Sequence, residues 1–492
     1  MLETTEDSHF FPDYSSSQHF EERREYASRR NFFRNGVEGR TLPHVINEHR
    51  GYDHELRETY GARRAYFAAN ALATPAEAHR YDEANPKSLR MLATVCAVVV
   101  LSLSTWFSSS AILPQLLELW EVDDPALGSL LTLLVNFGFI FGATASTLVG
   151  AADRYPASFL MSGGALGSAV FNFALLGCQS FEAALVLRFL CGVCFALIYP
   201  VACKVVTTWF VTRRGLAMGI VTGSVVLGSA APHFVLFISP ASQWQVLTAV
   251  CASASLLGAA LSKLAVRDGP FGAPRREFCV GEIWKLGQSG PLLCSFVGYF
   301  GHNWELYGLW SGFKSYLLAV QARGGDVDER AAALAMFFVI SIGVVGCVLG
   351  GELADRFGRV PVVVWCLAVS SASSLVVGHL EADGTAVLVV GLVWGLAAVT
   401  DSPQYSALVS ETCPPELLGT AIMVQMALGY IFTLPCMFAV PWLEENLGWV
   451  AAWSFLAPGP LCAVAAMLRL RRLRRLQLAA APDRRTAVVA AV

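Results

Sequence analysis

Ionisable side chains stand inside otherwise apolar stretches of this 492-residue chain, where they could bind or move charged groups. His302, Glu305 and Lys314 share one stretch, while Arg188 and Asp401 lie in two others. A carboxylate deprived of water holds a proton more readily, so Glu305 and Asp401 are candidates for binding and releasing protons. His302 precedes Glu305 by three residues and could exchange that proton or hydrogen-bond the carboxylate. Arg188 and Lys314 could hold an anionic substrate.

Each of these side chains also has a purely structural interpretation. Arg188 could pair with Glu305 or Asp401 as a strut, and His302 could bond a backbone carbonyl. Lys314 could extend to the membrane surface.

An aromatic and three small polar residues extend the set of candidates. Trp106 is followed closely by serines at 108–110, which could line a pathway or only pack helices together. Trp106 is included with the residues that could bind substrate. His233, beside Pro232, is expected to be a packing residue rather than a ligand.

The elements that must position these residues are apolar segments. The chain is 55% hydrophobic and 15% charged, against about 25% charged in a typical soluble domain. Twelve segments reach the ~20 residues needed to cross a bilayer as helix: 91–116, 126–150, 156–178, 181–207, 215–238, 243–266, 290–320, 329–353, 359–380, 384–409, 417–441 and 448–470. None shows barrel-type alternation, so the sequence predicts an all-α membrane protein with twelve transmembrane helices.

Lysine and arginine gather at alternate ends of these segments. One set of ends holds Lys87, Arg90, Arg154, Arg213, Arg214, Arg267, Arg275, Arg276, Lys285, Arg356, Arg359 and the run Arg469–Arg475. The other set holds Arg323 and Arg330 along with several acidic residues. Because cytoplasmic loops retain basic residues, both termini are predicted to be cytoplasmic, and we expect the plasma membrane rather than an organelle.

The segments divide the chain into five parts. We expect a partly disordered cytoplasmic tail over 1–90, six-helix bundles over 91–266 and 290–470, a cytoplasmic loop over 267–289 and a basic tail over 471–492. We expect a monomer that contacts the lipid bilayer.

The net charge of −3 argues against a nucleic-acid partner. Cys191 and Cys194 form a CxxC that we interpret as helix packing, so no metal and no cofactor is expected.

Landmarks in the two halves recur at one nearly constant offset. The matched pairs are Asp153 and Asp355, Gly192 and Gly395, Pro200 and Pro403, Trp106 and Trp310, and Gly215 and Gly419. Their separations lie between 202 and 204 residues. Internal repeats of this kind are common among membrane transporters.

Over residues 90–472 the chain resembles the major facilitator superfamily, whose members consist of two six-helix bundles. The family pattern G-x-L-a-D-R-x-G-R after its eighth span is matched by Gly351, Leu353, Asp355, Arg356, Gly358 and Arg359. The copy after the second span keeps Asp153 and Arg154 but has lost the glycines and the last basic residue. Arg188 and Gly192 match the R-x-x-x-G pattern of the fourth span. The stretch WFVTRRGLAMG is similar to that of permeases for small anions and carboxylates.

The resemblance implies that the first, fourth, seventh and tenth spans line a central pathway, where the charged candidates lie. It also implies that the loop motif acts as a conformational latch, with Asp355 facing the N-terminus of a neighbouring helix in one state and released in the other. Because the copy at Asp153 has decayed, Asp355 is expected to matter more.

The leading hypothesis is a secondary active transporter that moves a small organic or inorganic anion by alternating access, coupled to protons as a symporter. One alternative is an efflux antiporter for lipophilic or cationic compounds that uses Glu305 and Asp401. Another is a membrane sensor that does not transport, with the 90-residue tail as its signalling part. No nucleophile elbow, phosphate loop or metal cluster is present, so an enzyme is not expected.

Overall fold

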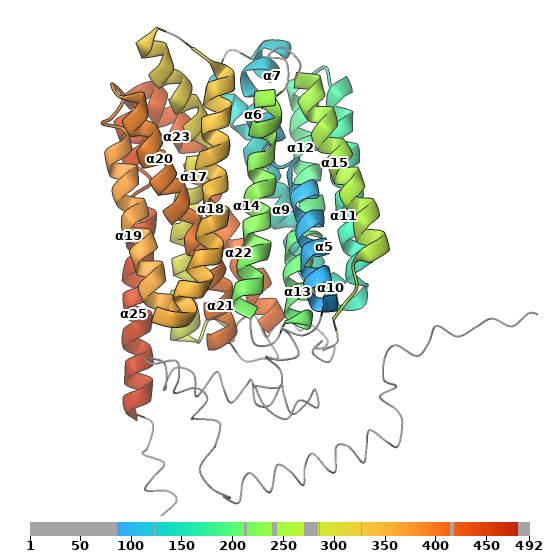
Figure 1. Ribbon diagram of the computed structural model, residues 1–492, viewed down its shortest axis with the longest axis vertical. Coiled ribbons are helices and arrows are strands. Elements are labelled where there is room, and N and C mark those ends of the chain that lie inside the picture. The colour runs from blue at the N-terminus through green and yellow to red at the C-terminus, as the bar shows by residue number, and fades with distance from the viewer. Residues whose placement is uncertain are drawn as a thin grey trace, which may run out of the picture. The chain divides into compact units, whose positions relative to one another are not determined.

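The computed structural model describes residues 86–122, 124–210, 214–238, 244–269, 284, 286–325, 327–413 and 418–480. These ranges contain helices and turns but no strand, which confirms the predicted all-α fold (Figure 1). Most of the predicted N-terminal tail, most of the central loop and the last residues lie outside the described ranges.

The helices follow one another along the chain as two series. The first is α5 (Pro86–Leu103), α6 (Ser108–Ala111), α7 (Leu113–Leu119), α8 (Pro125–Gly128), α9 (Leu130–Leu148), α10 (Ala151–Arg154), α11 (Ala157–Ala174), α12 (Phe181–Phe195), α13 (Tyr199–Trp209), α14 (Arg214–Ile238) and α15 (Trp244–Ala265). The second is α17 (Gly290–Gly324), α18 (Glu329–Phe357), α19 (Arg359–Val377), α20 (Gly384–Thr400), α21 (Ser402–Thr412), α22 (Leu418–Ile431), α23 (Thr433–Leu447), α24 (Trp449–Ser454) and α25 (Pro458–Ala480).

The described residues contain 11 helical segments long and apolar enough to cross a membrane. The predicted seventh span corresponds to α17, which is not among the 11. At 35 residues α17 is long enough to span, and it carries His302, Glu305 and Lys314. Eleven of the twelve predicted spans are therefore supported by apolar character. The remaining one, the seventh span α17, is the helix richest in candidate functional residues.

Five of the predicted spans are interrupted near their middle. The breaks lie at 104–107 between α5 and α6, at 196–198 between α12 and α13, at Asp401 between α20 and α21, at Phe432 between α22 and α23, and at 455–457 between α24 and α25. Prolines in the first turns of α13 and α21 account for two breaks, since proline lacks the N–H that a continuous helix requires. Non-helical backbone at membrane depth is tolerated only inside protein or beside a watery pathway, so the breaks should not face the lipid.

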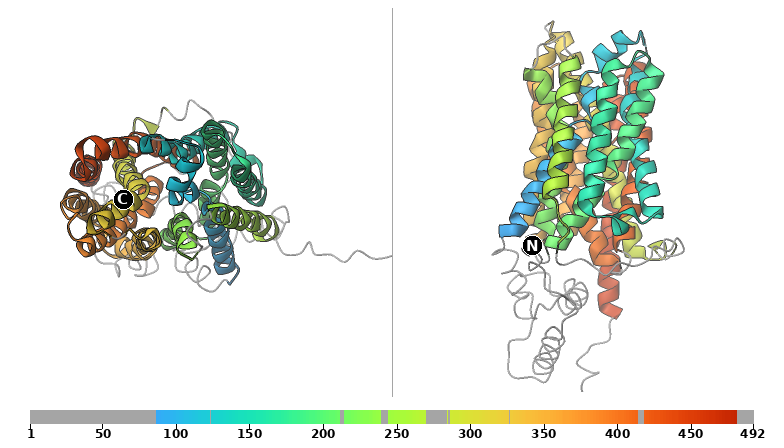
Figure 2. Two further views of the ribbon diagram at one scale, coloured as in Figure 1. Left: turned by 90° about the horizontal axis from the view of Figure 1, so that it is seen from above. Right: turned by 90° about the vertical axis from the view of Figure 1, so that its right-hand side faces the viewer.

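The two series of helices lie side by side (Figure 2). Helix α14 packs along α18, and α9 packs against α22 and α23, so these helices join the first series to the second. A buried aliphatic and aromatic core runs through both series.

Glycines at matching positions let helices cross closely in both halves. A Cβ built on Gly192 of α12 would lie 2.0 Å from the carbonyl oxygen of Val135 on α9. A Cβ built on Gly395 of α20 would lie 1.9 Å from the carbonyl oxygen of Val339 on α18. Each pair of helices meets backbone to backbone. Gly395 lies 203 residues after Gly192, and Val339 lies 204 residues after Val135. The internal repeat is therefore visible in packing as well as in sequence.

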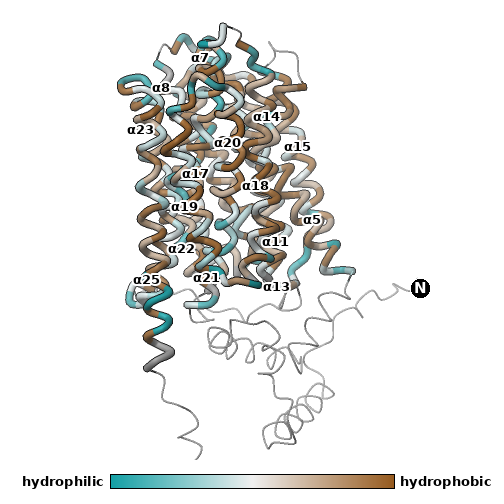
Figure 3. Tube along the Cα trace, turned by 60° about the vertical axis from the view of Figure 1, so that its left-hand side comes forward, coloured by the Kyte–Doolittle hydropathy of each residue, from teal (hydrophilic) through white to brown (hydrophobic). Residues whose placement is uncertain are grey.

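The two ends of the bundle differ in charge. One end carries the start of α5, the turn between α18 and α19 and the arginine-rich end of α25, and we call it the basic end. The opposite end carries α7, α8 and Glu444 and Glu445 of α23, and we call it the acidic end. Figure 3 shows apolar residues along the helices and hydrophilic residues towards both ends. Helix α25 continues to Ala480, through the start of the segment predicted as a basic tail.

Candidate functional site

Arg188 of α12 is buried and supports the break in the first span. Its guanidinium donates to the carbonyl oxygens of Thr105 (2.9 Å), Leu131 (3.4 Å) and Trp106, to Ser108 Oγ (3.4 Å) and to Asn172 Oδ1 (3.4 Å). Thr105 and Trp106 lie between α5 and α6, where carbonyl groups have lost their helical partners. Within the described ranges no carboxylate pairs with Arg188. Among the described residues, the charge is thus solvated by neutral oxygens alone.

Trp106 lies at the centre of an aromatic cluster between the two series of helices. Its indole stacks on Phe195 with ring centroids 4.9 Å apart, and its Nε1 donates to Asn136 Oδ1 at 3.1 Å. The second series contributes Tyr430, 5.8 Å from the Trp106 ring, and Tyr307, whose hydroxyl donates to that of Tyr430 at 2.7 Å. Asn136 in turn donates to Thr433 Oγ1 at 2.8 Å across the interface. Movement of one series against the other must rearrange this cluster.

His302 of α17 pairs with Asp401 and not with Glu305. Its Nδ1 lies 2.9 Å from Asp401 Oδ1, and both side chains are buried. The other oxygen of Asp401 accepts a hydrogen bond from Tyr405 at 2.8 Å. Asp401 forms the break between α20 and α21, so its carboxylate is held where the backbone is irregular. A histidine and a carboxylate in contact can share and pass on one proton.

Glu305 faces the interior of the second series of helices. Oε2 accepts from Ser370 Oγ of α19 at 2.6 Å, and Oε1 accepts from Trp394 Nε1 of α20 at 2.8 Å. Both donors are neutral, and the side chain is 1% exposed. Glu305 therefore joins three helices of the second series, and within the described ranges it forms no hydrogen bond or ion pair with the first series.

Lys314 of α17 contacts the first series directly, towards the acidic end. Its Nζ donates to the carbonyl oxygen of Ala111 at 2.6 Å and pairs with Glu329 Oε1 at 3.0 Å. Gln115 of α7 donates to both oxygens of Glu329, at 3.1 and 3.0 Å. At 6% exposed, Lys314 is buried at the interface rather than extended to the membrane surface.

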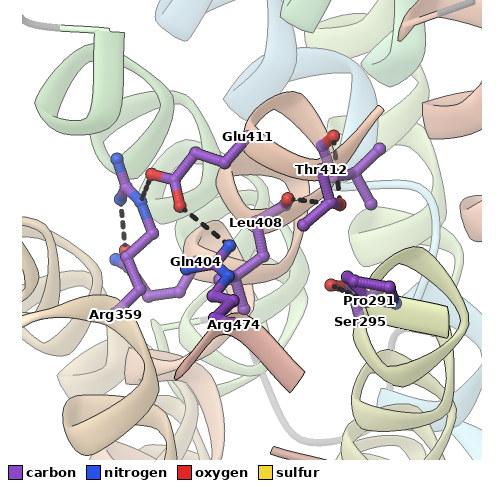
Figure 4. Close-up of polar contacts among 9 residues, drawn as sticks. Pro291, Ser295, Arg359, Gln404, Leu408, Glu411, Thr412 and Arg474 are labelled. Carbon is purple, nitrogen blue, oxygen red and sulfur yellow. Dashed lines mark hydrogen bonds and ion pairs between the residues drawn. The ribbon is translucent and has the colours of Figure 1, made fainter. Parts of the chain in front are cut away.

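The basic-end motif forms a charge network at the turn between α18 and α19 (Figure 4). Arg359 Nε pairs with Glu411 Oε1 at 2.5 Å and its Nη1 donates to Gln404 Oε1 at 2.8 Å, while Arg474 of α25 reaches Glu411 Oε2 at 3.2 Å. Arg356 instead makes an exposed pair with Glu352, which contributes little.

Of the two glycines of the motif, Gly358 is the one whose conformation favours glycine. Gly358 has φ of 101°, a conformation that other residues rarely adopt. A Cβ on Gly351 would lie 3.7 Å from the carbonyl oxygen of Gly215, so the end of α18 lies against the start of α14. The side chains of Asp153 and Asp355 lie outside what the structure describes, and Arg154 is exposed. The latch assigned to Asp355 therefore stays a prediction.

Sequence reasoning found the charged members of these groups but missed their neutral partners. The missed residues are Asn136, Asn172, Tyr307, Ser370, Trp394, Tyr405 and Tyr430, together with Glu329 and Gln115 at the acidic end. Spacing carries a signal only for Tyr405, which follows Asp401 by four residues. The other missed residues bond partners that lie far away along the chain. Across the described ranges, no three histidine, cysteine or acidic residues converge as they would around a metal ion.

A bundle of apolar helices with broken spans and buried charges at its centre is typical of membrane transporters. A family model described as Major Facilitator Superfamily matches residues 94–432 and 292–490, and the chain belongs to this family. It is a multi-pass integral membrane protein.

Two curated relatives are themselves transport proteins. The chain is 28% identical over 118 residues to the probable galactarate/D-glucarate transporter GudP of Escherichia coli (strain K12), covering 23% of this chain and 26% of that one. It is 26% identical over 286 residues to the agnestins efflux protein AgnL12 of Paecilomyces divaricatus, covering 56% of this chain and 62% of that one. The matches thus span less than two thirds of either relative.

Two solved structures share the fold at 15% sequence identity. The human organic anion transporter MFSD10 (TETRAN) superposes with a TM-score of 0.63 over 78% of this chain and 100% of that chain. A bacterial homologue of the human lysosomal transporter Spinster, inward-facing and unoccupied, gives 0.57 over 78% and 95%. At this identity the likeness concerns the fold alone.

Proposed function

We propose that this protein is a proton-coupled secondary transporter of a small organic anion. The observation that carries the proposal is the buried guanidinium of Arg188, which is solvated by carbonyl and amide oxygens and, among the described residues, by no carboxylate. A buried cation is costly unless an anion compensates it. An incoming carboxylate can supply that compensation with a bidentate hydrogen-bond pair.

The proton is assigned to the pair formed by His302 and Asp401. The pair lies on α17 and at the break of the tenth span, whereas Arg188 lies on the fourth. Anion and proton would therefore bind to opposite halves of the molecule. Each would favour closure of the halves around the centre, which is how a symporter couples two solutes in alternating access.

The basic end is proposed to face the cytoplasm of a plasma-membrane protein. Arginines at the α18–α19 turn and along the end of α25 support this orientation through the positive-inside rule. In that orientation the Lys314 and Glu329 contact closes the outer side, and the cluster around Arg359 lies on the inner side.

Similarity to known transporters supports an anion but does not select one. The curated relative GudP is described as a probable galactarate/D-glucarate transporter, and MFSD10 as an organic anion transporter. Both descriptions belong to those proteins and motivate the choice of compounds to test.

Uptake into proteoliposomes tests the proposal. Labelled organic acids of one and two carboxylates should accumulate when the outer medium is more acidic, and a protonophore should abolish accumulation. Control vesicles carry the Arg471→Gln variant, because Arg471 is exposed on α25 and should not affect uptake. Absence of anion uptake under every gradient would overturn the proposal.

Efflux of cationic or lipophilic compounds is the second candidate function. Similarity to the efflux protein AgnL12 favours it, as do Glu305 and Asp401, two buried carboxylates that could attract positive charge. Export of a cationic dye that is lost in Glu305→Gln but retained in Arg188→Gln would support this function over anion transport.

A further inference from the structure

One face of α17 runs beside the short helix α6 and ends at a cation. Tyr307 lies 6.4 Å from Trp106 and Trp310 5.6 Å from Phe107, measured between ring centroids. One turn further along, Lys314 Nζ donates to the carbonyl oxygen of Ala111 at 2.6 Å. The residues at 307, 310 and 314 are spaced by three and four positions and therefore share a helix face.

Several buried polar groups near this face have no hydrogen-bond partner in the described part of the chain. They are Trp310 Nε1, both ring nitrogens of His233 on α14, and Ser109 Oγ on α6. All three side chains are at most 3% exposed. His233 belongs to this region because α14, which carries it, packs against α6. Buried polar groups are almost always satisfied, so a group of unsatisfied ones calls for a ligand.

The two buried cations hold opposite ends of the same helical turn. Arg188 bonds Thr105, Trp106 and Ser108 at the start of α6, and Lys314 bonds Ala111 at its end. At 1.5 Å of rise per residue, the length of α6 from Ser108 to Ala111 is roughly 5 Å along its axis. Two cations that bond the two ends of so short a segment could take the two carboxylates of one dicarboxylic acid.

Lys314 already holds a carboxylate that can be displaced. Glu329 is 27% exposed, lies 3.0 Å from Lys314 and is steadied by Gln115. Its oxygen stands where the oxygen of a bound anion would stand. Exchange of Glu329 for a substrate carboxylate would leave the charge of Lys314 compensated and would release the acidic-end contact between α7 and α18.

We infer that Lys314, His233 and Trp310 form a second anion subsite, and that with Arg188 they select dicarboxylates over monocarboxylates of the same length. The inference rests on the proposed function, because it assigns a substrate class to the same pathway. Arg188 takes one carboxylate, and Lys314 takes the other in place of Glu329. The indole N–H of Trp310 and the ring of His233 supply hydrogen bonds to the second carboxylate.

The test compares succinate with butyrate, and adipate with hexanoate, in proteoliposome uptake by the full-length protein. The wild type should show a KM at least about tenfold lower for the dicarboxylate of each pair. Lys314→Gln should remove this preference by raising the dicarboxylate KM while the monocarboxylate KM stays within about twofold. The matched control Lys263→Gln, an exposed lysine on α15, should behave as wild type.

Two milder variants keep the test decisive if Lys314→Gln does not fold. Trp310→Phe keeps an aromatic ring but removes the indole N–H. It should raise the dicarboxylate KM about threefold without changing the monocarboxylate KM. Glu329→Gln removes the competing anion and should lower the dicarboxylate KM.

Equal KM values for the two members of each pair in wild type, or a preference unchanged in these variants, would overturn the inference while leaving anion transport standing. Failure to transport any acid would overturn the proposed function and the inference together.

Discussion

The two halves of the molecule share their helix packing but not their chemistry. Gly192 and Gly395, at equivalent places in the repeat, each bring a helix against the backbone of its neighbour within nearly the same distance. The buried charges differ: the first half holds Arg188 among neutral oxygens, whereas the second holds His302 with Asp401, and Glu305 with two neutral donors. A repeated scaffold thus surrounds the buried cation of one half with neutral groups, whereas the other half carries two buried carboxylates and a second buried cation, Lys314.

The loop motif differs between the halves in a similar way. In the second half Gly358 takes the positive φ that the turn requires. In the first half Pro156 stands at the matching position with φ of −59°, and the left-handed residue is Gly150 at φ of 62° instead. The first turn is therefore built differently, and only the second turn keeps the geometry of the full motif.

Among the substitutions that test the difference between the halves, Arg188→Gln should have the largest effect on anion uptake. Arg188→Gln removes the cation and leaves hydrogen-bonding capacity at the break in the first span. We expect kcat/KM for anion uptake to fall by about 100-fold, equivalent to roughly 2.7 kcal/mol of lost binding in the transition state. Uptake kinetics in proteoliposomes check this. Uptake within twofold of wild type would show that the cation of the first half has no part in anion binding.

The glycine crossings offer a test of the shared packing. Gly192→Ala and Gly395→Ala should each destabilise the protein by about 1–3 kcal/mol, because each new methyl group would meet a carbonyl oxygen and force the helices apart. Thermal unfolding of the purified protein measures the effect. Gly163→Ala is the matched control, since a Cβ at this helical glycine meets nothing within 4 Å. A Gly395 variant as stable as the control would refute the equivalence of the two crossings.

Glu305 should affect stability more than coupling. In Glu305→Gln the amide oxygen can still accept from Trp394, and the Ser370 hydroxyl can turn to a new acceptor. We expect a loss of about 1 kcal/mol in stability, as for one weakened buried hydrogen bond. The dependence of uptake on the pH gradient should be unchanged. Loss of that dependence would move the proton site from Asp401 to Glu305.

The smallest expected difference concerns the two copies of the loop motif. Asp355→Asn should lower kcat about threefold with little change in KM, because the predicted latch would favour one conformation by only a small margin. Asp153→Asn should have a weaker effect, since its copy has lost the glycines of the motif. Parallel measurement of kcat and KM decides, and equal losses in the two variants would remove the asymmetry.

Sequence predicted the elements of this fold better than the contacts within its site. Apolar length fixed the spans, and Pro200 and Pro403 marked two of the breaks. The break at 104–107 contains neither glycine nor proline, so local propensity gave no sign of it. It is stabilised from outside, by Arg188.

The pairing of His302 illustrates the same limit. A spacing of three residues favours contact with Glu305 on one helix face. The Nδ1 atom of the histidine instead lies 2.9 Å from Asp401 Oδ1, 99 residues further along, because the break in the tenth span brings that carboxylate to α17. The tertiary position of Asp401 therefore overrides the partner that spacing along the helix favours.

The most direct test of the division between the halves follows anion and proton in one experiment. Proteoliposomes loaded with a pH-sensitive dye and unlabelled acid would report labelled-anion exchange and substrate-dependent proton movement together. In Asp401→Asn, anion exchange should stay within about twofold of wild type while proton movement ceases, and in Arg188→Gln both should be lost. The account would be contradicted if Asp401→Asn still moved protons with the anion, or if it lost anion exchange as completely as Arg188→Gln.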